Sequence, residues 1–256
     1  MTTVKDILQF IERIAPPELK LEGDNIGLLC GRSDKEVKTV LVALDPFISV
    51  CREAAEEKAD LLVTHHPIIH GSISAVNDLT TFGQAMLELM ESGITAINAH
   101  TNLDCADGGV NDTLAKAIGL TDIQKIAADP HGLLRMGQVE QQSLADFLPK
   151  VKENLHCDGL RFVEGGKPVR KVAVGGGSCG SELAAVVAAG CDTFVTADVK
   201  YNQFWDAKML GINMIDAGHF CTENPVVAVL AEKIQAAFPD IQVKISKNHA
   251  DCMKFY

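Results

Sequence analysis

Apolar residues occur in two alternating patterns along the chain. Some form short continuous runs rich in Val, Ile and Leu, and between these runs Ala, Leu, Glu and Lys recur at helical spacing. The expected strands are 37–45, 59–66, 94–100, 169–177, 192–198 and 212–218, and the expected helices include 47–59, 80–92 and 181–190. Continuous apolar strands separated by helices are typical of sheets that are covered on both faces. The pattern therefore predicts an α/β fold.

The two halves of the chain carry the same pattern. VKTVLVALD, a helix and ADLLVTHH match VRKVAVGGG, a helix and CDTFVTAD at one constant offset, which pairs Val37 with Val169 and Val63 with Val195. After a shorter connection in the second half, SGITAINAH also pairs with LGINMIDAGH. These matches predict two similar α/β units that arose by internal duplication. The alternative is that the two halves resemble each other only as all α/β units do.

The segments outside the repeat predict the domain organisation. Residues 128–168 have the pattern strand, helix, strand and start a second domain, whereas the final helix and the strand IQVKISK return to complete the first. We therefore expect a first domain of residues 1–127 completed by 222–256, and a second domain of residues 128–221.

Composition narrows the functional class. Hydrophobic residues make up 47% of the chain and charged residues 22%, the balance of a soluble globular protein. The net charge of −11 disfavours binding to nucleic acid or to anionic lipid. The N-terminal segment carries charges at helical spacing rather than the apolar core of a signal peptide, and no apolar run reaches the roughly 18 residues of a membrane span. Eight cysteines without a C-x-x-C pair indicate reduced thiols, so we expect a cytoplasmic protein.

Histidines follow one of the predicted strands at its carboxyl end. His65 and His66 come after the apolar run LLVT and precede Pro67, which ends the strand. Ligands gather at this edge of parallel sheets. Side chains of neighbouring strand residues point to opposite faces, so both imidazoles reach one site only if the chain turns there. The alternative is one packed histidine and one exposed histidine.

Two further strand ends carry residues of the same types. His100 and Asp104 follow the third strand, and His219 and Glu223 follow the last strand of the second half. Glu223 also suits the first turn of a helix, where an acidic side chain is stabilised. Imidazole and carboxylate ligands together suit Zn, Fe, Mn, Ni or Co, and a carboxylate can bridge two ions. The convergence of these residues predicts a site for two divalent transition-metal ions.

A glycine-rich turn offers a competing interpretation. Residues 175–180, GGGSCG, satisfy G-x-G-x-x-G after a strand, and Asp198 lies about 20 residues further on, where a dinucleotide-binding fold carries its acidic residue. Asp198 is also the counterpart of His66 in the repeat, which gives its position another explanation. We interpret Gly175, Gly177 and Gly180 as a candidate cradle for an anion or phosphate beside the metal ions, and not as an NAD site.

The segments VTHHPI, HTNLD, GGVND and DAGHFCTE, in this order, resemble the Nif-three-like dinuclear-metal family, whose members are labelled GTP cyclohydrolase I type 2 homologues. The resemblance runs from DNIGLLCG (24–31) to the last helix, and the length is similar to that of short members without an inserted middle domain. It implies a ring-shaped homohexamer with metal sites facing an interior cavity. The tail NHADCMKFY departs from the family, whose members more usually carry proline and phenylalanine there. The metal ligands that the resemblance implies are His65, His66, Asp104, His219 and Glu223, with His100 in a supporting position.

The leading hypothesis is a dinuclear metal-dependent hydrolase that acts on a nucleotide-like or phosphorylated small molecule, similar to a GTP cyclohydrolase. Two ions bridged by Asp104 and Glu223 would lower the pKa of a shared water molecule, and no side chain is assigned a catalytic role beyond that metal-bound water. The alternative is a non-catalytic metal-binding or scaffold homohexamer with a regulatory role. A third interpretation is a nucleotide-binding protein centred on residues 175–180.

Overall fold

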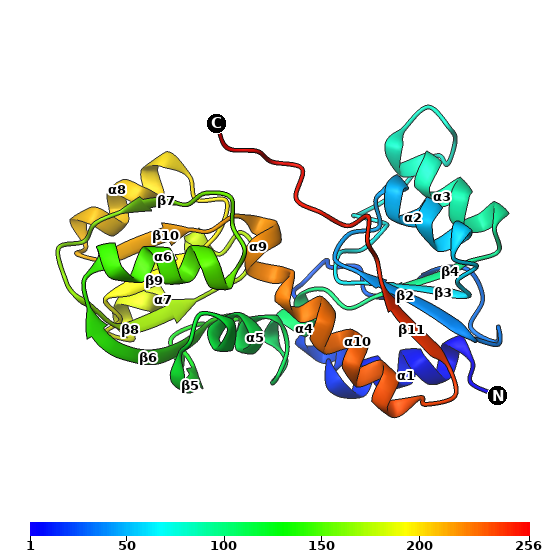
Figure 1. Ribbon diagram of the computed structural model, residues 1–256, viewed down its shortest axis with the longest axis horizontal. Coiled ribbons are helices and arrows are strands. Elements are labelled where there is room, and N and C mark those ends of the chain that lie inside the picture. The colour runs from blue at the N-terminus through cyan, green and yellow to red at the C-terminus, as the bar shows by residue number, and fades with distance from the viewer. The chain divides into compact units, whose positions relative to one another are not determined.

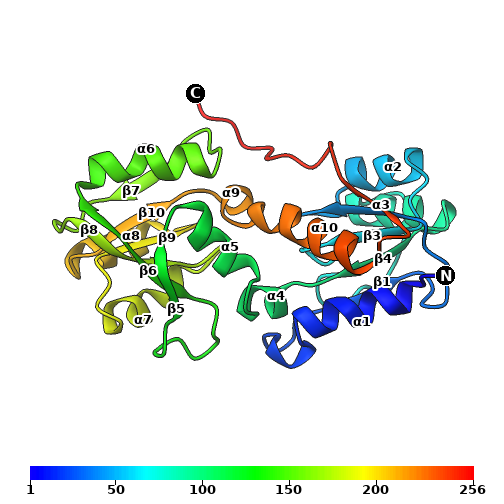
Figure 2. The ribbon, with the colours of Figure 1, turned by 60° about the horizontal axis from the view of Figure 1, so that its bottom comes forward.

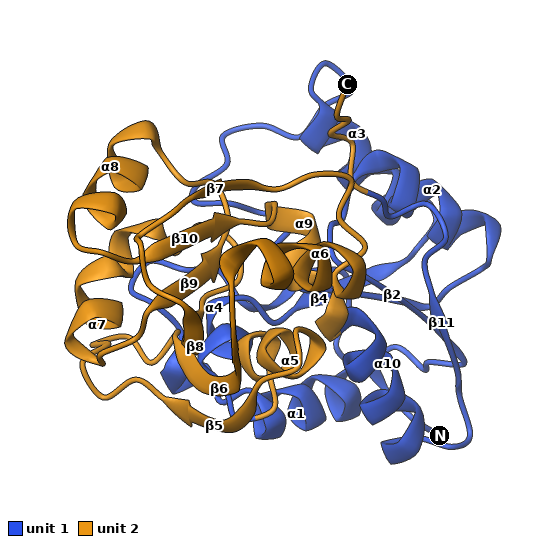
Figure 3. Cartoon of the chain, turned by 60° about the vertical axis from the view of Figure 1, so that its left-hand side comes forward, with its two compact units in different colours: residues 1–107, 227–250 blue, residues 108–226, 251–256 orange.

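The predicted strands form two separate sheets in the computed structural model, which describes residues 1–256. The first sheet belongs to unit 1, residues 1–107 and 227–250, and the second belongs to unit 2, residues 108–226 and 251–256 (Figure 3). Each unit is an α/β structure with its own buried core, so the predicted fold class is confirmed.

The sheet of unit 1 has the strand order β1-β4-β3-β2-β11. All neighbours are parallel except β1, which is antiparallel to β4, and the C-terminal strand β11 pairs with β2. The strands are β1 Gly27–Cys30, β2 Thr39–Ala43, β3 Leu61–Thr64, β4 Thr95–Asn98 and β11 Gln242–Ile245. Each of the central strands β3 and β4 is buried at all four positions, as their continuous apolar runs predict.

Helices cover both faces of this sheet (Figure 1). Helices α2 and α3 pack on one face against Leu41, Leu62 and Ala96, and α1 and α10 lie on the other face. The helices of this part of the chain are α1 Val4–Ile14, α2 Ile48–Glu56, α3 Thr81–Glu91, the short α4 Thr101–Cys105 and α10 Pro225–Ala237, with the 3-10 helix Pro17–Leu19.

The sheet of unit 2 has the strand order β5-β6-β8-β9-β10-β7. Strands β8, β9 and β10 are parallel, and β5, β6 and β7 pair in antiparallel fashion. The strands are β5 Thr121–Lys125, β6 Arg135–Gln142, β7 Arg161–Val163, β8 Val169–Val174, β9 Thr193–Thr196 and β10 Asn213–Asp216.

Helices α5 and α6 cover one face of this second sheet, and α7 and α8 cover the other (Figures 2 and 3). Leu114 from α5 and Phe147 and Val151 from α6 join Val172 and Ile215 of the sheet in one buried cluster. The helices are α5 Val110–Ala117, α6 Leu144–Asn154, α7 Leu183–Ala188, α8 Tyr201–Met209 and α9 His219–Glu223, with a 3-10 helix at Gly180–Glu182.

Both units contain the same four-stranded arrangement. The order β2-β3-β4-β1 in unit 1 matches β8-β9-β10-β7 in unit 2, and in each case the fourth strand is antiparallel to the third. A carboxylate before the second parallel strand also recurs. Asp60 accepts hydrogen bonds from the N–H groups of Lys38 and Thr39 at 2.8 and 3.0 Å, and Asp192 accepts them in the same way from the equivalent residues 170 and 171. The shared topology is that expected of a duplicated unit.

Unit 2 begins at Gly108, whereas the sequence analysis places residues 108–127 with the first domain. Leu114, Ala115 and Ile118 are buried in the cluster that also contains α6 and β8, so this segment packs within unit 2. The last six residues, 251–256, also belong to unit 2.

All eight cysteines carry free thiols, and Cys252 alone is exposed. No helix of the structure combines the length and the apolar character needed to cross a membrane.

Candidate metal centre

The two adjacent histidines lie just beyond the end of a strand. Strand β3 ends at Thr64, whose Oγ1 donates a hydrogen bond to the carbonyl of His66 at 2.6 Å, and the N–H of His66 donates to the carbonyl of Leu44 at 2.9 Å. The chain therefore turns at this point. The ring centroids of His65 and His66 lie 4.9 Å apart, so the turn brings both imidazoles to the same side.

His100 completes a group of three imidazoles within unit 1. Its ring centroid lies 5.3 Å from that of His65 and 5.5 Å from that of His66. One ring nitrogen from each of the three residues lies within 4.8 Å of the others, so the three imidazoles could bind a single metal ion. The sequence analysis gives His100 a supporting position, and the structure brings it as near as the two expected ligands.

Asp104 adds a carboxylate to this group. It stands in the short helix α4, which begins directly after His100, and only 7% of its surface is exposed. Its Oδ1 lies 3.6 Å from Nε2 of the buried His65, which is longer than a hydrogen bond. The two side chains thus point toward each other with a separation that suits two ligands better than a donor and an acceptor.

Each imidazole of this group has its Nδ1 held by an oxygen atom. Nδ1 of His65 lies 2.9 Å from the carbonyl oxygen of Ala99, and Nδ1 of His66 lies 2.6 Å from Oδ1 of Asp45. Nδ1 of His100 lies 2.8 Å from Oδ1 of Asp24. In a neutral imidazole the nitrogen that faces an acceptor carries the proton, so these partners assign the lone pair to Nε2. This is the arrangement that orients histidine ligands of metal ions.

Hydrogen bonds at the edge of the histidine group keep Asp24, the partner of His100, ionised. Burial alone would raise the pKa of Asp24, but hydrogen bonds from Thr101 and His100 outweigh it and hold the pKa below its ordinary value. Burial, together with the charges of His100 and His66, lowers the pKa of the neighbouring His70. The surroundings therefore favour an ionised Asp24 and a neutral His70.

Unit 2 contains a second pair of ligand-type residues. Nε2 of His219 lies 3.1 Å from Oε2 of Glu223, one helical turn further along α9, and Nδ1 of His219 lies 2.7 Å from Oδ2 of Asp198. Asp198 follows β9 with a φ of 50°, a left-handed conformation that aspartate tolerates better than most residues. His219 thus has the same carboxylate-held Nδ1 as His66 and His100. Glu223 is buried, with 4% of its surface exposed.

The glycine-rich turn does not support the predicted anion cradle. The N–H group of Gly175 donates to the carbonyl of Val195 at 3.0 Å, and that of Gly177 donates to Oγ1 of Thr222 at 3.0 Å. A ligand would therefore have to displace hydrogen bonds that hold the turn.

Packing explains the glycines instead. A Cβ atom on Gly177 would lie 2.2 Å from Oε1 of Glu223, and one on Gly180 would lie 2.7 Å from Oε1 of Gln203. Gly177 and Gly180 lack a Cβ atom because the side chains of Glu223 and Gln203 lie against their backbone.

Sequence reasoning did not identify two of the residues that hold the imidazoles. Asp45 is the last residue of the run VKTVLVALD, and Asp24 lies ahead of β1, far from His100 in the sequence. A signal for Asp45 was available, since it follows the end of β2, the strand that pairs with β3. The sequence analysis considers Asp198 as the acidic residue of a dinucleotide-binding motif and as the counterpart of His66, but not as a partner of His219.

Comparison with known proteins decides the family. The model of the family described as Duf34/NIF3 (NGG1p interacting factor 3) matches residues 2–251. The chain belongs to the DUF34/NIF3 family. The resemblance drawn from the sequence segments is thereby confirmed.

Relatives of this DUF34/NIF3 protein cover its whole length. A protein of Clostridium perfringens named "GTP cyclohydrolase 1 type 2 homolog" is 31% identical over 98% of this chain and 99% of its own. A crystal structure of a Bacillus cereus protein related to NIF3 has a TM-score of 0.94 at 24% identity, covering 100% and 99% of the two chains, and shows the shared fold. A hypothetical protein of Staphylococcus aureus has a TM-score of 0.91 at 27% identity, with 99% of each chain covered.

The donor set of this DUF34/NIF3 protein fits a divalent transition-metal ion. Within unit 1, three imidazoles with assigned Nε2 lone pairs and a buried carboxylate stand close together. Imidazole and carboxylate are the ligands of Zn, Fe, Mn, Ni and Co in proteins. The unit therefore contains a group of side chains able to bind a metal ion.

Proposed function

We propose that His65, His66 and Asp104 of unit 1, together with His219 and Glu223 of unit 2, bind two divalent transition-metal ions, and that the protein is a hydrolase. The observation that carries the proposal is the contact between Nδ1 of each of these histidines and an oxygen atom. Oxygen acceptors hold Nδ1 of all three of these imidazoles at 2.6–2.9 Å, which prepares every Nε2 to bind a cation.

The two buried carboxylates have a distinct role in this proposal. Asp104 and Glu223 come from different halves of the chain, and each offers two oxygen atoms, so each is a candidate to bridge both ions. Their negative charges would reduce the repulsion between the cations. When bound, two such ions supply Lewis acidity and lower the pKa of water, so that hydrolysis proceeds near neutral pH.

The aspartates behind the histidines complete the site. Asp45 holds the ring of His66, and Asp198 holds the ring of His219. Asp24 holds His100, which stands near enough to His65 and His66 to serve as a further ligand or as support. These carboxylates fix the tautomer and the orientation of each ring, and they increase the basicity of the nitrogen that binds the metal ion.

The proposed substrate is a nucleotide-like or phosphorylated small molecule. Relatives that match almost the whole chain are named GTP cyclohydrolase 1 type 2 homologs, which points to a purine nucleotide or a compound like it. A dinuclear site also suits phosphoesters, because two ions can hold both the attacking and the leaving oxygen.

Metal analysis followed by a substrate screen tests this function. Protein purified without chelator should contain close to two ions per chain. Protein loaded with Zn, Mn or Fe is then assayed against nucleotides, phosphoesters, cyclic amides and peptides, with the double variant His65→Ala, His66→Ala as the inactive control. We expect turnover of a nucleotide or phosphoester that the control lacks. Protein that holds no metal and also ignores added metal would contradict the proposal.

The alternative is a non-catalytic metal-binding or scaffold protein. The family description includes the words "interacting factor", said of the protein that gave the family its name, which favours a role in binding another protein. Such a protein shares the ligands but needs no exchangeable coordination position. Fully bound metal with slow exchange of added isotope and no turnover in the screen would favour this alternative over hydrolysis.

A further inference from the structure

Two buried thiols are in contact beside the candidate ligands of unit 2. Cys221 stands in α9 between His219 and Glu223. Its thiol is hydrogen-bonded to the thiol of Cys157, which lies in the connection between α6 and β7. Sγ of Cys157 also donates a hydrogen bond, at 3.3 Å, to the carbonyl of Ala217 ahead of α9. The side chain of Cys157 therefore contacts the segment that carries the ligands at two points.

Both cysteines belong to the core of unit 2. Cys157 and Cys221 lie in its buried apolar cluster, with 6% and 7% of their surfaces exposed, and both carry free thiols. Neither thiol has a part in the proposed metal site. A disulfide requires two cysteines whose sulfur atoms can meet, and these two already do. In reducing compartments such disulfides are usually transient and respond to oxidants.

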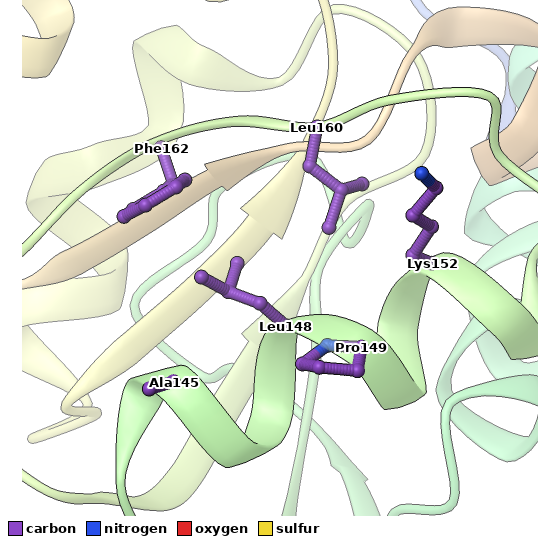
Figure 4. A pocket seen from close by; sticks show the side chains of 6 residues that line it. All are labelled: Ala145, Leu148, Pro149, Lys152, Leu160 and Phe162. Atoms are coloured by element: carbon purple, nitrogen blue, oxygen red, sulfur yellow. The ribbon is translucent and has the colours of Figure 1, made fainter.

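An open groove adjoins the connection that carries Cys157 (Figure 4). The groove has a volume of about 440 Å³, and Leu160 and Phe162 of this connection and of β7 line it opposite α6. Lys152 of α6 also lines it, and its carbonyl accepts a hydrogen bond from the N–H group of Cys157 at 2.9 Å. A groove of this size has room for a molecule as small as hydrogen peroxide. It also leaves the connection space to move.

We infer that Cys157 and Cys221 are a redox-active pair, which a hydroperoxide converts to a disulfide. The sulfur of one thiol attacks an oxygen atom of hydrogen peroxide, the O–O bond breaks, and a sulfenic acid and one water molecule form. The sulfur of the second thiol then attacks the sulfenic sulfur, expels a second water molecule and completes the S–S bond. Two electrons pass from the sulfurs to the peroxide. A dithiol such as dithiothreitol restores both thiols and is itself oxidised to a disulfide.

Closing this disulfide affects the candidate ligands through α9. A disulfide holds its sulfur atoms about 2 Å apart, closer than two hydrogen-bonded thiols, so Cys221 and the connection before β7 must move toward each other. Helix α9 has five residues, and a shift of Cys221 at its middle therefore reaches His219 and Glu223 at its ends. Glu223 is buried and lies against Gly177, which leaves it little freedom to compensate. Oxidation thus weakens metal binding, a consequence that rests on the proposed function of these two ligands.

Peptide mapping tests the redox-active pair itself. The starting protein is the full-length Cys252→Ser variant, because the exposed thiol of Cys252 would otherwise link separate chains. The folded, metal-free protein is treated with hydrogen peroxide, its remaining thiols are alkylated, and it is digested without reductant. We expect a peptide pair joined through Cys157 and Cys221, and the return of both thiols after dithiothreitol.

Two further changes in the same protein serve as controls. Cys157→Ser keeps a hydroxyl donor for the carbonyl of Ala217 and should form no disulfide. Cys191→Ala removes another buried cysteine of unit 2, 3% exposed, and should form the disulfide as the starting protein does. Circular dichroism shows whether each variant is folded. A folded starting protein in which peroxide forms no Cys157–Cys221 disulfide would overturn the inference.

Titration with Zn, which peroxide does not oxidise, tests the effect on the ligands. We expect the oxidised starting protein to bind Zn more weakly than the reduced protein by about tenfold or more. Cys157→Ser should bind Zn as the reduced starting protein does, before and after peroxide. A disulfide that leaves Zn affinity unchanged would overturn the link to α9. A reduced protein that binds no Zn would contradict the proposed function and this link with it, whereas the peptide map still decides whether the pair is redox-active.

Discussion

At the scale of single residues, a carboxylate at Nδ1 is common to three histidines of the candidate metal centre. His66, His100 and His219 each face a carboxylate, whereas His65 faces the neutral carbonyl of Ala99. A carboxylate both fixes the ring and strengthens the electron donation of Nε2. The metal affinity of the protein should therefore depend on residues that do not themselves bind the ion.

Asp45→Asn tests that dependence. The amide still has an oxygen to accept from Nδ1 of His66 but has lost the charge, so we expect metal affinity to fall by about 10–100-fold with no change in thermal unfolding of the metal-free protein. Isothermal titration of the metal-free protein with Zn measures the affinity. Asp34→Asn, at an exposed position of unit 1, is the control and should bind as the wild type does. Equal affinities for the two variants would exclude a role for Asp45.

A second prediction concerns Gly177, whose φ is +62° and whose missing Cβ makes room for Glu223. Gly177→Ala should lower the free energy of unfolding by about 1–3 kcal/mol because the backbone is strained, and it should also displace the carboxylate and weaken metal binding. Gly190→Ala is matched in conformation, with a φ of +69°, but meets nothing within 4 Å. Chemical denaturation and metal titration of both variants separate the effects: the control should lose stability only. A Gly177→Ala protein with intact metal affinity would show that Glu223 does not need this space.

Residue types at strand ends were sufficient to select the candidate ligands, but not their partners. His65, His66 and Asp104 stand out because polar side chains end apolar strands. Asp24 and the carbonyl of Ala99 have no such signal, since contacts between distant segments depend on the register of the sheet. The glycine-rich turn shows the converse, because a motif that suggests an anion site serves instead to make room for Glu223.

At the scale of elements, one buried carboxylate fastens the C-terminal strand to a helix. Glu53 of α2 accepts hydrogen bonds from Oγ of Ser246 at 2.5 Å and from the N–H groups of Lys247 and Asn248 at 2.8 and 3.0 Å. Burial alone would raise the pKa of Glu53, but these hydrogen bonds outweigh it and the pKa lies below its ordinary value. The ionised group therefore stabilises the end of β11.

Glu53→Gln should weaken this attachment, with an effect that depends on pH. A carboxyl group whose pKa is lowered by folding contributes stability above its unfolded pKa, near 4.5, and loses it as the pH falls through the folded value. We expect the variant to be less stable by about 2 kcal/mol at pH 7, with the difference shrinking below pH 4.5. Urea unfolding across this pH range checks it, with the exposed Glu56→Gln as control. A difference that stayed constant with pH would assign the effect to packing.

Elements with a clear apolar pattern were predictable, and short or exposed ones were not. Strands of the repeat such as β3, β4, β9 and β10 were expected because each lies within a mostly apolar run, and all four are fully buried. Strand β5 has no such pattern, since four of its five residues are exposed; it pairs with β6, and Ile123 packs against the core of unit 2. Helix α4 has five residues, too few for a period to show.

At the scale of the whole molecule, duplication explains why ligand-type residues occur in both units. The same strand order places the ends of β3 and β4 in unit 1, and of β9 and β10 in unit 2, in equivalent positions. His66 and Asp198 occupy matching places after β3 and β9, one as a candidate ligand and the other as the partner of His219. The two copies have thus diverged into different roles at one position. The homohexamer that the family resemblance implies stays a prediction.

The central claim is that two ions share Asp104 and Glu223, and metal counts per chain in single variants test it most directly. Without one bridging carboxylate, two divalent ions about 4 Å apart would repel each other by several kcal/mol more, even at an effective dielectric constant near 20. We predict two ions per chain in the wild type, none in Asp104→Ala or Glu223→Ala, and close to one in His65→Ala, with all four proteins folded. An Asp104→Ala protein that keeps both ions would contradict the account.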